Sequence, residues 1–194
     1  MVQSAEDILR NFGMANLLAE TSLSEIEASH SLDFGRKFGP TDLDESYYPQ
    51  FDENIRLQAS KMAKHYEIFY CLEQTIRLLI KERLSENDEN WWEKKIPQQV
   101  RTEAKRRYDE EMNKGVTPRS YELLDYTNFG ELSVIINANW DDCFSDTFAS
   151  RNAVRTVLSM LNTLRGPIAH CGLLAEDEVT RLHLTLRSLF RLME

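Results

Sequence analysis

Apolar residues recur at helical spacing over four stretches of the chain, at residues 54–84, 128–140, 150–164 and 175–193. Within each stretch they fall three or four positions apart, which is the pattern of a helix with one buried face. The stripe in the first stretch is made of Ile55, Met62, Phe69, Leu72, Ile76, Leu79 and Ile80. Four such helices can bury their stripes against one another, so the pattern predicts an all-α fold built on a four-helix bundle.

Capping residues mark where two of these helices begin and end. Asn128 with Glu131 three positions later predicts a capping box at the start of the second helix. Gly166 and Pro167 follow the third helix, and we expect them to end it at about Leu164, because proline lacks a backbone N–H and disrupts a helix interior.

A charged helix is predicted at residues 97–113, where the apolar stripe is thin. Pro97 fits the first helical position, where its missing N–H does no harm. One interpretation is a solvated outer helix. The alternative is a basic strip that faces RNA, formed by Arg101, Lys105, Arg106 and Arg107.

The N-terminal residues 1–55 differ from the bundle predicted at residues 56–194. Helices are expected at residues 5–20 and 21–30, followed by an irregular arm over residues 31–54 that is interrupted by glycine and proline. The arm is rich in aromatic residues: Phe34, Phe38, Tyr47, Tyr48 and Phe51. Aromatic side chains bury large apolar areas, so we expect the arm to pack against the bundle or a partner.

The net charge of −9 argues against a broad surface that coats nucleic acid, but a local basic site needs only a few arginines.

We expect neither a leader peptide nor a membrane-spanning helix, because no long apolar run occurs. The three cysteines are odd in number and widely spaced, so a reducing cytoplasm fits best. Asp141 and Asp142 lack spaced companion ligands, so a loop or cap is favoured over a metal site, and no cofactor is expected.

Arg165 and His170 lie between the third and fourth helices, with four residues between them. A corner between helices can hold the two side chains together, and the pair suits phosphate chemistry. Arginine offers a fixed fork of donors, and histidine changes protonation near neutral pH. Structural roles stay open: His170 capping a helix end and Arg165 neutralising a helix dipole. Cys171 suggests a thiol enzyme only weakly, because no third orienting group is visible.

The segment Leu164-Arg-Gly-Pro-Ile-Ala-His170 resembles the signature of HEPN domains. Further segments, in order along the chain, resemble the Swt1-type branch of that family. They are Leu72-Glu73 with Arg77-Leu-Leu-Ile80, Trp91-Trp92 through Ile96-Pro97, Leu124-Asp-Tyr126 through Phe129-Gly-Glu-Leu132, and Asn139-Trp140. The resemblance covers roughly residues 60–194. Glu73 and Arg77 are four positions apart, so we also expect them to pair on the surface of their helix.

The resemblance implies a helical bundle that homodimerises, and a metal-independent endoribonuclease of the toxin, abortive-infection or anti-phage type. Arg165 would then hold the scissile phosphate of RNA, and His170 would act as general base or acid at a site shared by two protomers. An antitoxin or a defence-complex partner is also implied, and a membrane is not.

Active members of the family often carry a polar residue directly after the arginine, whereas this chain has Gly166. The alternative is therefore a catalytically inactive HEPN module that serves dimerisation or binding in a larger defence complex.

Overall fold

The structure, a computed structural model, describes residues 22–23, 26, 48–86 and 88–193. The chain divides into two compact units, Met1–Phe51 and Asp52–Glu194, and each is described by itself.

Little of the first unit falls within the described residues. Ser22, Leu23 and Ile26 are helical, and η1 (Tyr48–Gln50) is a short 3-10 turn. The ring of Phe51 packs edge-on against Tyr48, with 6.5 Å between the ring centroids. The predicted helix at 5–20, and nearly all of the second helix and the aromatic arm, lie outside the described residues.

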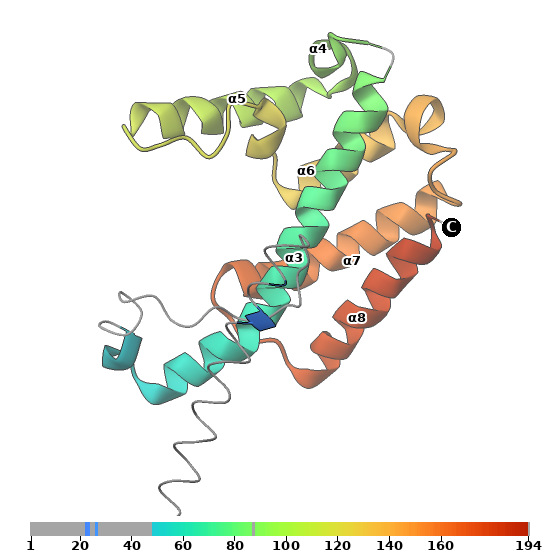
Figure 1. Cartoon of the computed structure of the whole chain (residues 1–194). Helices are drawn as coiled ribbons and strands as arrows, with labels where there is room; N and C mark the ends of the chain where they lie inside the picture. The colour runs from blue at the N-terminus through green and yellow to red at the C-terminus, as the bar shows by residue number, and fades with distance from the viewer. Residues whose placement is uncertain (1–21, 24–25, 27–47, 87, 194) are drawn as a thin grey trace, which may run out of the picture. The chain divides into compact units, whose positions relative to one another are not determined.

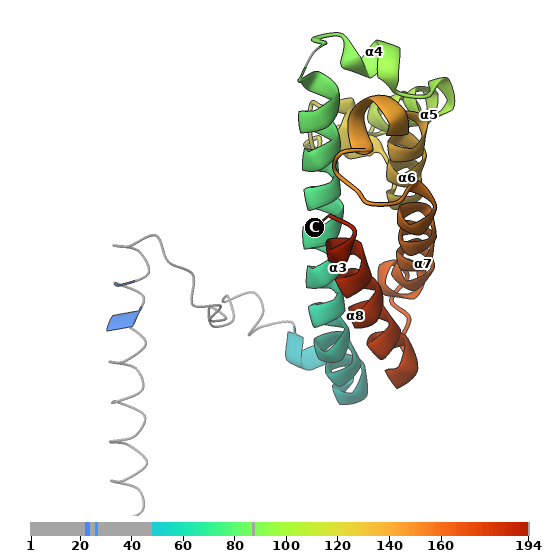
Figure 2. The ribbon, with the colours of Figure 1, turned by 90° about the vertical axis from the view of Figure 1, so that its right-hand side faces the viewer.

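Every element that the structure describes in the second unit is a helix, and four of these helices form its core (Figure 1). These are α3 (Glu53–Ser85), α6 (Phe129–Ala138), α7 (Arg151–Ala169) and α8 (Glu176–Arg191). Helix α7 packs along both α6 and α8, and α3 packs against α6 and α7 (Figure 2). The predictions of an all-α fold and a helical bundle are therefore confirmed.

The apolar stripe of α3 is buried only over its second half. Phe69, Leu72, Ile76, Ile80 and Leu84 all lie in the core. Ile55, which the pattern places on the same stripe, is 59% exposed. Of the described residues, none in the first two turns of this 33-residue helix belongs to the apolar core. No helix in the described ranges is both long and apolar enough to cross a bilayer.

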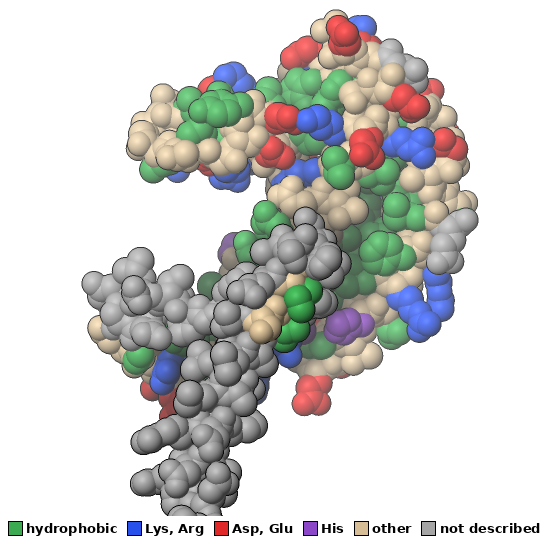
Figure 3. Space-filling view, in the orientation of Figure 1, with side chains coloured by type: hydrophobic (Ala, Val, Ile, Leu, Met, Phe, Trp, Pro, Cys, Tyr) green, Lys and Arg blue, Asp and Glu red, His purple; other side chains and the backbone are tan. Residues whose placement is uncertain are grey.

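An apolar groove of about 310 Å³ separates α3 from α8. Its walls include Leu72 and Leu79 from α3 and Leu186, Phe190 and Met193 at the C-terminal end of the chain. Figure 3 shows green apolar side chains gathered on this face of the molecule. Because the groove separates α8 from α3, α8 packs mainly against α7.

The predicted charged helix is α5 (Gln98–Asn113). Pro97 is its N-cap residue, whereas the sequence predicted that Pro97 would be the first residue of the helix. Arg107 anchors it with two 2.8 Å bonds to the carboxylate of Glu131 and a third 2.8 Å bond to the carbonyl of Tyr126. The remaining three basic residues of the suggested RNA-facing strip also pair with carboxylates: Arg101, Lys105 and Arg106. The pairing favours the solvated outer helix.

The hydrophobic periodicity does not predict three short elements, because each is only about one turn long and a periodic pattern needs several turns. They are α4 (Trp91–Lys95), η2 (Leu123–Tyr126) and the π-turn η3 (Trp140–Phe144). The π-turn contains Asp141 and Asp142, which were expected in a loop or cap.

The capping box at the start of α6 is confirmed. The Asn128 side chain accepts a 3.0 Å bond from the N–H of Glu131, and the Glu131 carboxylate accepts a 2.8 Å bond from the N–H of Asn128. Because the same carboxylate binds Arg107, the cap also ties α5 to α6.

The prediction that Gly166 and Pro167 end the third helix is wrong, because α7 runs through both to Ala169. Pro167 has no backbone N–H, so the helix lacks the hydrogen bond from residue 167 to the carbonyl of Thr163, four residues earlier. Two circumstances reduce the penalty. The residue before the proline has no Cβ to clash with the ring, and only two helical residues follow it. The break therefore falls after His170, several positions later than expected.

Candidate functional site

The C-terminal end of α7 is closed by a Schellman-type cap that includes His170. His170 is the C-cap residue, and its N–H bonds to the carbonyls of Gly166 and Pro167 at 3.1 and 3.2 Å. Cys171 follows with φ of 57°, in the left-handed region, and Gly172 donates its N–H to the carbonyl of Pro167 at 2.7 Å. This six-residue closure satisfies the end of the helix. It leaves the imidazole of His170 on the surface.

Arg165 leaves α7 toward α3. Its Nε donates a 3.0 Å hydrogen bond to Oε2 of Glu73, and the arginine side chain is 34% exposed. Neither Nη group has a hydrogen-bond acceptor among the described residues. The guanidinium is therefore oriented through Nε, while its outer edge keeps donors for a ligand.

Glu73 also binds a second arginine, Arg77, and we call these three residues the arginine group. The other carboxylate oxygen of Glu73 pairs with Nη2 of Arg77, which also donates a 2.8 Å bond to the carbonyl of Thr127. The predicted pairing of Glu73 with Arg77 is thus present, but its expected place on the surface is wrong, because Arg77 is buried. Two guanidinium groups and one carboxylate leave a net charge of +1, which favours an anionic ligand.

A cavity of about 160 Å³ opens beside this group, between α3 and the end of α7. Its walls are formed by Tyr66, Phe69, Tyr70, Glu73, Gln74, Arg77, Arg165, Ile168 and Ala169. His170 does not line it. Five helical steps turn a side chain by about 500°, so Arg165 and His170 leave α7 roughly 140° apart. Arg165 therefore lines this cavity, whereas His170 lies on the exposed surface outside it.

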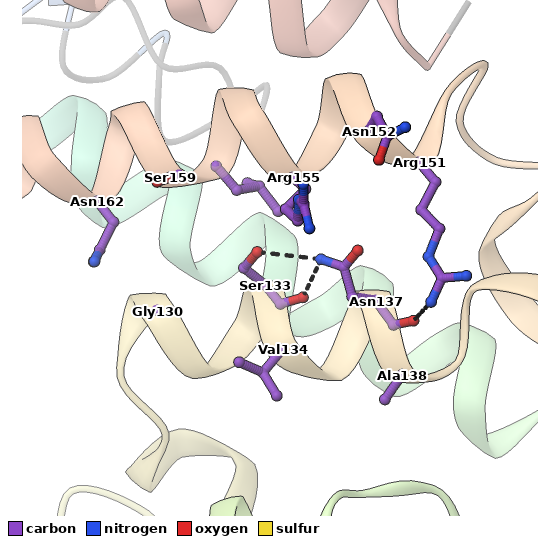
Figure 4. A pocket seen from close by; sticks show the side chains of 11 residues that line it. Gly130, Ser133, Val134, Asn137, Ala138, Arg151, Asn152, Arg155, Ser159 and Asn162 are labelled. Carbon is purple, nitrogen blue, oxygen red and sulfur yellow. Dashed lines mark hydrogen bonds between the residues drawn. The ribbon is translucent and has the colours of Figure 1, made fainter.

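A second, larger groove of about 840 Å³ lies between α6 and α7 (Figure 4). Amide and hydroxyl side chains line it: Ser133, Asn137, Asn152, Ser159 and Asn162. Arg151 at one end donates a 2.7 Å bond to the carbonyl of Asn137, whereas Arg155 points between the two helices and has no ion-pair partner in the described part of the chain.

The sequence of α7 contains three arginines and no carboxylate. The single acidic residue of α6, Glu131, is occupied by Arg107. The exposed side of α7, from Arg155 to Arg165, is thus polar and cationic, although the net charge of the chain is −9. An acidic side chain on this side is Glu178 of α8, which lines a pocket with Arg155 and is paired with Arg181.

Glu73 is the site residue that sequence reasoning did not recognise. Its spacing from Arg77 was visible, but an acidic residue beside a buried stripe is ordinarily solvated. Its contact with Arg165 spans 92 positions, so only the packing of α3 against α7 reveals it.

The family model described as Swt1-like HEPN matches residues 67–194. No curated protein sequence and no solved structure matches the chain. The matched segment begins in α3 shortly before Glu73 and extends to the C-terminus, so it contains the arginine group and the end of α7.

Proposed function

This chain belongs to the Swt1-like HEPN family, and on that basis we propose that it is a metal-independent endoribonuclease whose catalytic residues are Arg165 and His170. It would serve as a toxin or an anti-phage effector. The observation that carries the proposal is the state of Arg165: its Nε is fixed by Glu73, while its Nη groups have no acceptor among the described residues and can bind a phosphate.

In the proposed reaction, the Nη groups of Arg165 bind the scissile phosphate and stabilise the negative charge that develops on its oxygens. His170 acts as general base toward the ribose 2′-hydroxyl or as general acid toward the leaving 5′-oxygen. The 2′-oxygen forms a bond to phosphorus as the bond from phosphorus to the 5′-oxygen breaks. The products are a 2′,3′-cyclic phosphate and a 5′-hydroxyl, so DNA cannot be cleaved in this way.

We propose that the working enzyme is a homodimer. Within one chain Arg165 faces α3, while His170 lies outside the cavity that contains Arg165. Two copies that meet at the C-terminal ends of their α7 helices would place the arginine of one protomer across a cleft from the histidine of the other. Such a shared site accounts for the use of two residues that diverge in the monomer.

A second candidate function is a binding or dimerisation module without catalysis, within a larger defence complex. Gly166 favours it: a Cβ placed there would meet no atom within 4 Å, so space exists for the polar side chain that active relatives often carry, yet none is present. In this case Arg165 serves as an anchor between α7 and α3.

The deciding experiment is RNA cleavage in excess EDTA, comparing wild type with His170→Ala and with His183→Ala. His183 is an exposed histidine on α8 and serves as the matched control. Light scattering confirms equal dimer content. The nuclease proposal expects cyclic-phosphate ends from wild type and from His183→Ala, and a loss of at least about 100-fold in His170→Ala. Equal cleavage by all three proteins would exclude His170 as a catalytic residue, and cleavage by none would favour the non-catalytic module.

A further inference from the structure

The cavity beside Arg165 has an aromatic rim that the proposed chemistry does not use. Building on the proposed nuclease, we propose that this cavity holds one unstacked nucleobase of single-stranded RNA, adjacent to the phosphate bound by Arg165. Tyr66 and Tyr70 would provide the stacking surface, and Gln74 would contact the edge of the base.

The two tyrosines are one turn apart on α3 and lie on the same side of it. Tyr66 and Tyr70 are 61% and 57% exposed, and their ring centroids are 6.4 Å apart with an interplanar angle of 34°. Neither hydroxyl has a hydrogen-bond partner among the described residues. Two neighbouring exposed rings form a flat apolar surface on which another group can pack, and nucleobases stack readily on such rings.

The interior of the cavity suits one flat heterocycle. Phe69 and Ile168 are buried and supply apolar walls, while Gln74 at the rim is exposed and offers one acceptor and two donors. The volume of about 160 Å³ is too small for a protein helix or a base pair. An amide that both donates and accepts can read the Watson–Crick edge of a base.

The charges divide the cavity into two parts. The negative charge of Glu73 is held between Arg77 and Arg165, so it does not repel a neutral base. Arg165 lines the cavity, and its Nη groups, which have no acceptor in the described part of the chain, would bind the phosphate linked to that base. Bases in a duplex are already stacked and paired, so the site selects single strands or loops.

The test measures binding without cleavage. A fluorescein-labelled hexanucleotide with 2′-O-methyl sugars has no free 2′-hydroxyl, so fluorescence anisotropy reports its affinity alone. Tyr70→Ala is expected to weaken binding roughly 5- to 150-fold, the range for loss of one stacked base, whereas Tyr70→Phe retains the affinity. Tyr121→Ala removes a tyrosine that is 80% exposed and outside the cavity, and it is the matched control.

A series of hexanucleotides, each abasic at one position, identifies the stacked base. At one position the abasic probe should bind wild type and Tyr70→Ala equally, because the stacking partner is already missing. Unchanged affinity in Tyr70→Ala, an equal loss with every abasic probe, or no binding of any probe by wild type would overturn the inference. Dissociation of a dimer by Tyr70→Ala in the absence of RNA would also overturn it, and would identify this face as a protein interface. If the binding pattern appears but wild type never cleaves RNA, the base site stands and the nuclease proposal fails.

Discussion

Arg165 on α7 donates a 3.0 Å hydrogen bond through Nε to Oε2 of Glu73 on α3, across 92 positions of sequence. The same carboxylate binds the buried Arg77. One acidic side chain therefore orients the proposed phosphate-binding group and joins the longest helix of the bundle to the helix that carries both proposed catalytic residues.

Glu73→Gln tests this joint role. Glutamine keeps the shape but loses the charge that serves two guanidinium groups, so the free energy of unfolding should fall by about 1–3 kcal/mol, as for charged hydrogen bonds lost in a buried site. RNA cleavage should fall as well, because Arg165 is no longer held. Urea unfolding and the cleavage assay check the two effects.

The control for Glu73→Gln is Glu122→Gln. Glu122 also pairs with α3, through Lys81 at 2.6 Å, but both side chains are exposed. That change should cost less than about 1 kcal/mol. Equal losses in the two variants would show that the buried position of Glu73 has no special effect.

Arg155→Gln tests the groove between α6 and α7 as part of the path of the RNA. Arg155 has no ion-pair partner within the described ranges, so its loss should leave stability unchanged and weaken binding of RNA of any sequence. The slope of log K against log salt concentration should become shallower by about 0.7, the value for one contact to single-stranded nucleic acid. Arg187→Gln, an exposed arginine on α8, is the control. Equal salt slopes for the two variants would exclude Arg155 from the RNA path.

Cys171→Gly should stabilise the protein. Cys171 adopts φ of 57°, which costs a residue with a Cβ about 1–2 kcal/mol and costs glycine little. The greater freedom of glycine in the unfolded chain offsets part of this gain, so the net expectation is about 0.5–1 kcal/mol. Thermal and urea unfolding measure it. Cys171→Ala retains the unfavourable conformation and should leave stability unchanged, and a gain in that variant would assign the effect to loss of the thiol instead.

His65 should make the fold sensitive to acid. Burial lowers the pKa of His65, and the nearby positive charges of His183 and Lys64 lower it further. Its buried Nδ1 has no hydrogen-bond partner among the described residues. The unfolded chain therefore binds a proton on His65 at higher pH than the folded chain does, so stability is lost as pH falls through the ordinary value of about 6.5 toward the folded pKa.

Urea unfolding of wild type and His65→Gln between about pH 7.5 and 5 measures this contribution, because the titration of other groups is common to both proteins. The wild type should lose more stability than the variant over that interval. Parallel curves would contradict the expectation and show that His65 titrates alike in the folded and unfolded chains.

The spacing of apolar residues was sufficient to predict the long helices. It did not predict where α7 ends, because local preferences and tertiary packing compete there. The apolar residues of α6 are buried as its pattern predicts, because several turns repeat that pattern, whereas Phe190 near the end of α8 is 55% exposed. Gly166 and Pro167 were read as a helix end because their local preferences are strong, but packing of Leu161, Leu164 and Ile168 in the core carries α7 past them.

The sequence by itself determined the class of fold, the capping of α6 and the resemblance carried by Arg165 and His170, because helix periodicity, caps and short motifs depend on neighbouring residues. Only the tertiary structure decided that Arg165 is bound by Glu73, that Arg77 is buried, and that the two tyrosines of α3 share a cavity with the end of α7. These features depend on which faces of α3 and α7 meet. The faces that meet are those that leave the least apolar surface exposed over the whole bundle. No local segment of the sequence determines this arrangement.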